Sequence, residues 1–216
     1  MLKGKKVLLT AGPTYEPIDP VRFIGNHSTG KMGFALAEAF ADAGADVTLV
    51  SGPVNLKTLH PQIHTVSVMT ADEMFAEVQQ YAAEANIWVF AAAVADYKPK
   101  QAAATKIKKD SDSFSIELVK NVDIAATLGK QKKPGQFAVG FALETNNELA
   151  HAQQKLQKKN LDMVILNSLQ DAGAGFKHDT NKISIVERDK ITNFELKAKT
   201  AVAQDIVRTI IERMYA

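Results

Sequence analysis

Short apolar segments alternate along most of the chain with segments whose apolar residues recur at helical spacing. Residues 6–11 form the first apolar run, and residues 30–43 follow with apolar positions at i, i+3 and i+4. This alternation is typical of a mainly parallel sheet with crossover helices. Further strands are predicted over residues 46–51, 63–68, 87–95, 137–142 and 163–167, and further helices after an N-cap at Thr70 and over residues 148–159.

Two segments depart from this alternation. Residues 97–112 are polar and rich in lysine, and residues 114–119 alternate like an exposed strand, which predicts a flap over about residues 97–120. Residues 183–187 and 192–196 flank Arg188-Asp189-Lys190 and predict an antiparallel hairpin before a closing amphipathic helix. We therefore predict one α/β domain over residues 1–216. Its sheet is Rossmann-like, mostly parallel and flanked by helices, with a C-terminal antiparallel hairpin and a lysine-bearing flap.

Length and composition narrow the classes of function. A chain of 216 residues is long enough to bury a sizeable core, and its net charge of +2 is too small to imply binding to nucleic acid or to a membrane surface. No apolar run approaches the roughly 20 residues that a membrane span needs. The chain has no cysteine, which excludes disulfides, thiolate metal ligands and a cysteine nucleophile. We expect a cytoplasmic protein.

The loop after the first strand resembles a phosphate-binding P-loop without being one. Gly25 and Gly30-Lys31 have the spacing of G-x-x-x-x-G-K-[ST], but Met32 stands where the magnesium-binding hydroxyl belongs. A long insertion also separates Gly25 from the strand that ends near Ala11. A helix that begins at Gly30 can still hold an anion on its free N–H groups. The loop therefore indicates a nucleotide or phosphate site, but not an ordinary ATPase.

Four segments with candidate chemistry fall at predicted strand ends, where open α/β sheets bind ligands. They are residues 11–33, 94–98, 141–147 and 167–181. In the first, Asn26 can donate to a developing oxyanion or hold an acyl phosphate ester. The alternative is structural, because Ser28 or Thr29 can simply cap the following helix.

The other candidate residues are equally ambiguous taken one at a time. The alanines of residues 91–95 allow close approach of a base or ribose, or merely tight helix packing, and Asp96 can bind a metal or ribose hydroxyl or cap a turn. Two groups of lysines suit phosphates that enter and leave, or form a solvated surface: Lys106, Lys108 and Lys109 in the flap, and Lys155, Lys158 and Lys159 on one helix. Phe141 can stack on a base or pack in the core.

Reagents for acid–base or nucleophilic catalysis are sparse. The five histidines show no metal-site spacing, and neither G-x-S-x-G nor G-x-G-x-x-G is present. Chemistry on this chain would therefore rest on positioning, charge neutralisation and a bound metal, as in phosphoryl and nucleotidyl transfer.

Taken together, these segments resemble one family along essentially the whole chain, the phosphopantothenate–cysteine ligases (phosphopantothenoylcysteine synthetases) of coenzyme A biosynthesis. Two positions depart from the family pattern: Val122 replaces a common proline, and Thr29 replaces a common serine. The matching motifs are TAGPT at 10–14, EPIDPVRFI at 16–24, NHSTGKMG at 26–33, AAVADY at 92–97, KIKK at 106–109, KNVDI at 120–124 and GFALETN at 140–146.

The resemblance implies a two-step reaction. Bacterial members activate the carboxylate of 4′-phosphopantothenate with CTP as an acyl cytidylate, and L-cysteine then attacks to give 4′-phosphopantothenoylcysteine and CMP. It also implies that Asn26 binds the acyl cytidylate, that Lys106 neutralises the triphosphate from the flap, and that Mg²⁺ bridges the phosphates through ligands the sequence does not identify. The implied CTP site comprises Gly12, Ala92, Ala93, Val94, Ala95, Asp96, Val122, Asp123, Ile124, Ala125, Phe141, Lys155 and Lys159.

The family likeness further implies a homodimer, fused to or associated with a flavin-dependent phosphopantothenoylcysteine decarboxylase in many bacteria. Eukaryotic relatives use ATP, so the nucleotide preference stays open. Two other hypotheses remain: a short-chain NAD(P)-dependent oxidoreductase, and a flavin- or nucleotide-binding module without turnover. The first lacks G-x-G-x-x-G and a Tyr-x-x-x-Lys pair.

Overall fold

Eight strands form one sheet, six of which run parallel to their neighbours. The computed structural model describes residues 1–108, 113–144, 146–168 and 178–215. The last two strands in chain order complete one edge of the sheet in antiparallel orientation. In spatial order the strands are β13 (Ile191–Asn193), β12 (Ile183–Val186), β10 (Met163–Ser168), β9 (Phe137–Glu144), β6 (Ile87–Phe90), β1 (Lys6–Ala11), β4 (Asp46–Ser51) and β5 (Ile63–Ser67).

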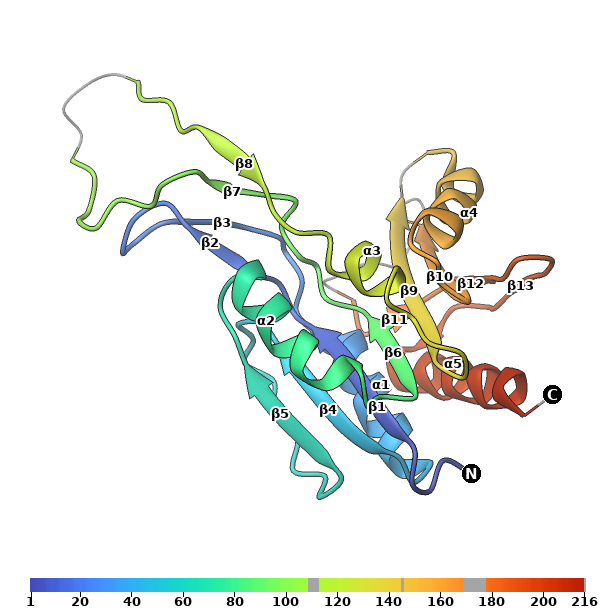
Figure 1. Cartoon of the computed structure of the whole chain (residues 1–216). Helices are drawn as coiled ribbons and strands as arrows, with labels where there is room; N and C mark the ends of the chain where they lie inside the picture. The colour runs from blue at the N-terminus through green and yellow to red at the C-terminus, as the bar shows by residue number, and fades with distance from the viewer. Residues whose placement is uncertain (109–112, 145, 169–177, 216) are drawn as a thin grey trace.

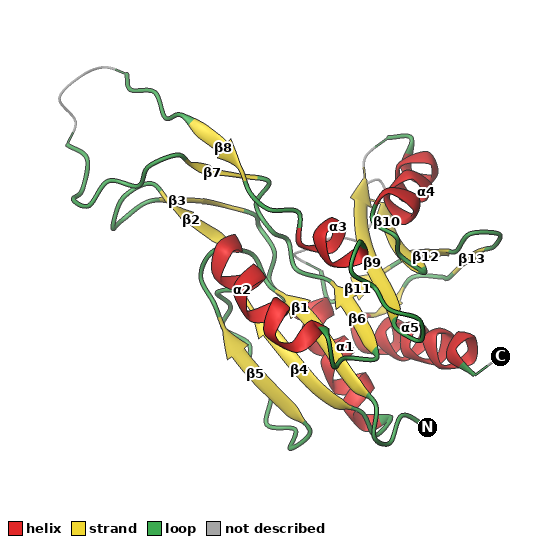
Figure 2. Cartoon of the chain, in the orientation of Figure 1, coloured by secondary structure: helices red, strands yellow, loops and turns green. Residues whose placement is uncertain are grey.

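Helices cover both faces of this sheet (Figure 2). α1 (Lys31–Asp42) and α5 (Lys199–Met214) lie on one face, and α2 (Ala71–Ala82), α3 (Ile124–Gly129) and α4 (Glu148–Lys158) lie on the other. Successive side chains of a strand point to opposite faces. Val7 and Leu9 therefore join the core under α1 and α5, whereas Leu8 joins the core under α2. Burial on both faces explains why these strands are apolar throughout.

Two antiparallel strand pairs project together from the carboxyl edge of the sheet, at the upper left of Figure 1. One pair joins β2 (Tyr15–Pro17) to β3 (Phe23–Gly25), and the other joins β7 (Tyr97–Pro99) to β8 (Leu118–Lys120). We call these two pairs and the loops between their strands the arm. The segment expected as a flap supplies β7 and β8. A small ladder between β11 (Thr180–Asn181) and β14 (Lys197–Ala198) lies before α5.

The predicted fold class is confirmed, a mostly parallel Rossmann-like sheet flanked by helices with a C-terminal antiparallel hairpin. The predicted Thr70 cap is also present, as a capping box with Glu73. The expected strand over residues 87–95 is shorter and ends at Phe90. Most of the candidate segment over residues 167–181 lies outside the described residues. No described helix has both the length and the apolar content to cross a membrane.

The early end of β6 has a local cause. Beyond Phe90 the chain leaves the sheet and follows the loop after β1, because its N–H groups find partners there. The Ala92 N–H bonds to Thr10 Oγ1 at 3.3 Å, the Ala93 N–H to Gly12 O at 2.8 Å, and the Ala95 N–H to Thr14 Oγ1 at 3.0 Å.

Close packing between α1 and β1 makes a test of this architecture possible. A Cβ on Gly33 would lie 2.5 Å from Ala11 Cβ. Helix propensity alone predicts that Gly33→Ala stabilises the protein by about 1 kcal/mol, whereas overpacking typically costs about 1–3 kcal/mol. We expect the overpacking to win, so urea denaturation should show a lower free energy of unfolding. In the Ala11→Gly background the same substitution should be less harmful or even stabilising. A stabilising effect in the wild-type background would contradict the packing argument.

Candidate functional site

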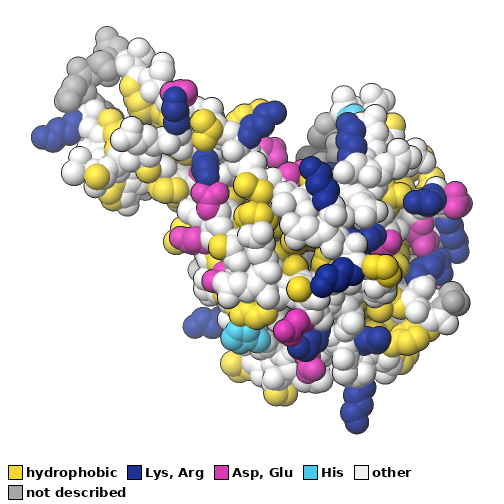
Figure 3. Space-filling model, viewed as in Figure 1, with side chains coloured by type: hydrophobic (Ala, Val, Ile, Leu, Met, Phe, Trp, Pro, Cys, Tyr) yellow, Lys and Arg dark blue, Asp and Glu magenta, His cyan; other side chains and the backbone are white. Residues whose placement is uncertain are grey.

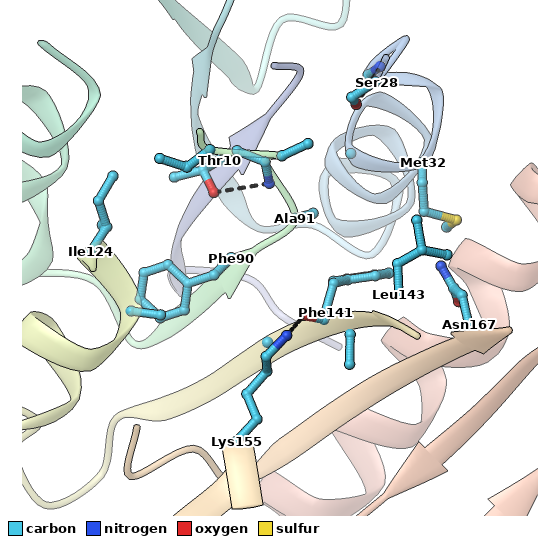
Figure 4. A pocket seen from close by; sticks show the side chains of 18 of the residues that line it. Thr10, Ser28, Met32, Phe90, Ala91, Ile124, Phe141, Leu143, Lys155 and Asn167 are labelled. Carbon is cyan, nitrogen blue, oxygen red and sulfur yellow. Dashed lines mark hydrogen bonds between the residues drawn. The ribbon is translucent and has the colours of Figure 1, made fainter. Parts of the chain in front are cut away.

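A cavity of about 320 Å³ opens at the carboxyl ends of β1, β6, β9 and β10. Its wall carries both backbone and side-chain groups from segments far apart in the sequence (Figure 4). The residues of the expected nucleotide site that line it are Ala92, Ala93, Val94, Ala95, Asp96, Val122, Asp123, Ile124, Ala125, Phe141, Lys155 and Lys159. The structure thus brings together nearly all of the set that the resemblance implied.

Three of the expected site residues do not line this cavity. Gly12 lies behind its wall, where its carbonyl accepts the Ala93 N–H. Asn26 is exposed and donates through Nδ2 to Ala93 O at 3.1 Å and to Val94 O at 3.2 Å. Lys106 is exposed on the arm. Asn26 is thus held against the cavity wall, and Lys106 belongs to a segment attached at its rim. Lys109 and Thr145 lie outside the described residues.

The alanine-rich wall presents its backbone at a defined position. Its residues are half-buried up to Val94, and the hydrogen bonds to Thr10, Gly12 and Thr14 hold this segment along the loop after β1. Small side chains leave the peptide groups accessible to a flat ligand. The arrangement is suited to contact with a base or ribose through the main chain.

The two lysines of α4 act differently at the opposite wall. Lys155 Nζ donates to Phe141 O at 3.0 Å (Figure 4), and Lys159 Nζ pairs with Asp123 at 2.8 Å. Asp123 also caps α3 by accepting the Ala126 N–H. Burial raises the pKa of Asp123, but the hydrogen bond from Lys159 and the cap outweigh it and leave the pKa below its ordinary value. Both lysines are thereby fixed beside the cavity.

Other lining residues were not among the predicted site residues. Asn167 and Asn181 are the first and last residues of the candidate segment 167–181, although neither was named as a site residue, and Lys199 carries no local pattern that marks it. Lys31, which stands at the lysine position of the P-loop-like spacing, pairs with Asp179 at 2.6 Å. Among the described residues no group of three or more histidine or acidic side chains is arranged to hold a metal ion.

A buried carboxylate fastens the two loops of the arm to each other. The Asp19 side chain is fully buried and accepts the N–H groups of Val21 at 2.8 Å, Arg22 at 2.9 Å and Ile107 at 3.1 Å. The Arg22 guanidinium pairs with the same carboxylate and donates to Ile107 O at 3.0 Å. Since Ile107 follows Lys106 directly, this clamp fixes the position of the Lys106 backbone on the arm.

The fold and the cavity define a Rossmann-like α/β domain with a ligand site at the carboxyl ends of its strands. The chain matches the family model described as "DNA/pantothenate metabolism flavoprotein C-terminal domain" over residues 2–214, and it belongs to this family. This assignment is consistent with the resemblance noted in the sequence.

Several relatives support this assignment. The chain is 51% identical over 211 residues to a "Cysteine/Cysteine sulfinic acid decarboxylase" of an unidentified prokaryote, covering 97% of this chain and 59% of that protein. It is 46% identical over 212 residues to the "Coenzyme A biosynthesis bifunctional protein CoaBC" of Haemophilus influenzae, covering 98% and 52%. The crystal structure of a C-terminal domain of CoaBC superposes with a TM-score of 0.84 at 37% identity, covering 99% and 97%. The chain spans between half and three fifths of the length of these curated relatives.

The clamp predicts a local effect of Asp19→Asn. Losing the carboxylate charge weakens the bonds to Arg22 and Ile107, so hydrogen exchange should become faster in the peptide that contains Ile107. Glu117→Gln is the matched control, because it removes an exposed ion pair with Lys100 on the same arm. Equal exchange at Ile107 in both variants would show that Asp19 does not hold the arm.

The same clamp predicts a dependence of stability on pH. The Arg22 hydrogen bond, which outweighs the opposing effect of burial, holds the pKa of Asp19 far below its usual range. A lowered pKa in the folded state stabilises the protein above about pH 4, the ordinary pKa of aspartate, and this contribution is lost as the pH falls further. The difference in Tm between wild type and Asp19→Asn should therefore shrink below pH 4. A difference that stays constant with pH would contradict this assignment.

Proposed function

We propose that this domain ligates 4′-phosphopantothenate to L-cysteine, with CTP as the activating nucleotide. The observation that carries the proposal is the single cavity in which the nucleotide residues of the family motifs come together. In the first step a carboxylate oxygen attacks the α-phosphorus of CTP, and pyrophosphate leaves. In the second the cysteine nitrogen attacks the acyl carbon, the bond from that carbon to the phosphate-bound oxygen breaks, CMP leaves, and a proton passes to water.

The residues that line the cavity support this proposal because they can hold the nucleotide and its phosphates in place for the reaction. The backbone of residues 91–95 lines the cavity and can offer carbonyl acceptors to the base and ribose, and Phe141, Lys155 and Lys159 form the facing wall. Lysine charges at this wall neutralise phosphates without a fixed fork geometry, which suits a ligand that changes from triphosphate to acyl phosphate. A reaction of this kind needs little acid–base equipment from the protein.

Asn26 and Lys106 complete the proposed site from outside the cavity. Asn26 is anchored by its amide to the wall at Ala93 and Val94, so its position relative to a ligand there is defined. It serves as the group that orients the acyl carbonyl and stabilises negative charge developing on the carbonyl oxygen. Lys106, on the arm beside the clamp, approaches the triphosphate when the arm lies over the cavity.

Magnesium fits this site as a companion of the nucleotide rather than as a resident ion. Mg²⁺ usually keeps several waters and is bound through substrate phosphates with one or two carboxylates. Asp96 lines the cavity and is exposed to solvent, and Asp123 is the second lining carboxylate but is engaged by Lys159. Asp96 is therefore the protein group proposed to face the metal, whose role is to neutralise phosphate charge.

The proposed assembly is a homodimer in the cytoplasm, in association with a phosphopantothenoylcysteine decarboxylase. Exposed apolar side chains on the arm support the dimer, because Figure 3 shows hydrophobic groups along this projection. Phe23 is 50% exposed and Phe114 is 56% exposed. Basic and acidic side chains are interspersed on the rest of the visible face, in keeping with partners that are small molecules rather than nucleic acid or membrane.

The direct test incubates the protein with phosphopantothenate, Mg²⁺, cysteine and one nucleotide at a time. We expect CMP and pyrophosphate in equal amounts with CTP, in a reaction that requires phosphopantothenate, and slower turnover with ATP. Cysteine alone should release no carbon dioxide, which separates this activity from that named for the decarboxylase relative. Absence of pyrophosphate release with every nucleotide would refute the ligase proposal.

Variants test the two residues outside the cavity. Asn26→Asp replaces a neutral donor by a charge, and turnover should fall by about 10²–10³-fold, as when an oxyanion donor is removed. Lys106→Gln should slow turnover while leaving the Tm unchanged, and the neighbouring exposed Lys108→Gln is its control. Wild-type turnover in Asn26→Asp, or early melting of Lys106→Gln, would assign these residues other roles.

A further inference from the structure

The cavity has a second end, away from the proposed nucleotide wall. It is lined by Asn167 at the end of β10, Asn181 in β11 and Lys199 at the start of α5. Asn167 lies opposite Leu143 in the strand register, and Figure 4 shows it close to Leu143 and Met32, far from Ile124. This end therefore belongs to the same cavity but is built from different elements.

Two buried acceptors at this end lack partners among the residues that the structure describes. Asn181 is only 2% exposed, and neither its Oδ1 nor that of Asn167 has a hydrogen-bond partner within this part of the chain. Buried polar atoms in folded proteins are nearly always paired, so each exception calls for an explanation. Because both oxygens belong to residues that line a cavity, the simplest explanation is a ligand that brings hydrogen-bond donors to them.

Positive charge lies beside these acceptors. Lys199 is 7% exposed, and its Nζ donates to His178 O at 2.6 Å. The N-terminus of α1, at Gly30 and Lys31, lines the same cavity, and its partial positive charge favours an anion. Burial and the charge of Lys31 lower the pKa of Lys199. A bound anion would stabilise the charged form of Lys199 against both burial and the charge of Lys31. This end therefore favours a ligand with a negatively charged group as well as a hydrogen-bond donor for the asparagine oxygens.

We propose that this end binds the amino-acid substrate, with Lys199 and the α1 N-terminus on its carboxylate and the Asn167 and Asn181 oxygens on its amine. The inference rests on the proposed ligase function and names the residues for its second substrate. An α-amino acid carries a carboxylate and an amine on the same carbon. The carboxylate matches the positive charge at this end, and the amine matches the unpaired asparagine oxygens. A phosphate satisfies Lys199 and the α1 N-terminus but not the two asparagine oxygens, because its own oxygens repel them.

The location suits the second step of the reaction. Ser28, Thr29 and Gly30 line this cavity and follow Asn26 after one residue, so the α1 N-terminus that holds the carboxylate and the proposed acyl site share one loop. The ammonium group of the bound amino acid first gives one proton to water, and the two N–H groups that remain bond to the asparagine oxygens, which leaves the nitrogen lone pair free to attack the acyl carbon. Met32 and Leu143 provide apolar contact for the CH₂–SH group.

The carboxylate contact is tested with cysteamine, which has the thiol and amine of cysteine but no carboxylate. We expect wild type to prefer cysteine over cysteamine in kcat/KM by about tenfold or more, as a charged hydrogen bond implies. In Lys199→Met this preference should nearly disappear, because only the reaction of cysteine is impaired. Lys190→Met, on the exposed hairpin, should keep the wild-type preference. Equal use of both amines by wild type, or an equal loss for both in Lys199→Met, would refute the carboxylate contact.

The amine contact is tested with Asn181→Leu. Replacing an unpaired buried acceptor by an apolar group of similar size should leave the Tm equal or higher, while the KM for cysteine rises. Pyrophosphate release without cysteine should be unchanged, since the first step does not use this end. A lower Tm with an unchanged KM for cysteine would make Asn181 structural. A raised KM for CTP instead would assign this end to the triphosphate. Absence of pyrophosphate release in wild type would contradict the proposed function itself.

Discussion

The site depends on how closely the loop after β1 approaches its neighbours at the carboxyl edge of the sheet. A Cβ on Gly52 would lie 1.6 Å from Pro13 O, and one on Gly33 would touch Ala11, so no larger residue is compatible with this packing. The approach carries the loop between β1 and β2 under residues 91–95, whose N–H groups it binds. The cavity wall is consequently made of main chain held by the carbonyl of Gly12 and the hydroxyl groups of Thr10 and Thr14, which gives a ligand rigid contacts.

The close approach of the loop after β1 also divides the cavity into two ends. The start of α1 is brought beside β10 and α5, where uncharged amides and one buried lysine gather, whereas α3 and α4 place fixed lysines beside the alanine-rich wall. One end thus suits a nucleotide and the other a small zwitterion. A ligase must hold two such ligands at once, and the acyl group has to reach from one to the other.

Much of the fold was predictable because each strand of a parallel sheet is covered on both faces and therefore apolar throughout. The length of β6 was not, because the bonds that draw residues 92–95 out of the sheet come from Thr10, Gly12 and Thr14, far away in sequence. Lys155 and Lys159 could be proposed from the family motifs. Asn181 and Lys199 could not, since their significance arises only when β11 and α5 close the far end of the cavity.

The proposed ligase function requires that activation of the carboxylate and formation of the amide be separate steps in one cavity. The most direct measurement is to mix the protein with CTP, Mg²⁺ and phosphopantothenate in the absence of cysteine, quench the reaction, and search for the acyl cytidylate by mass spectrometry. The account predicts an enzyme-bound acyl cytidylate, formed with one pyrophosphate per occupied site and consumed when cysteine is added. Pyrophosphate released only when cysteine is present, with no acyl cytidylate detected, would contradict it.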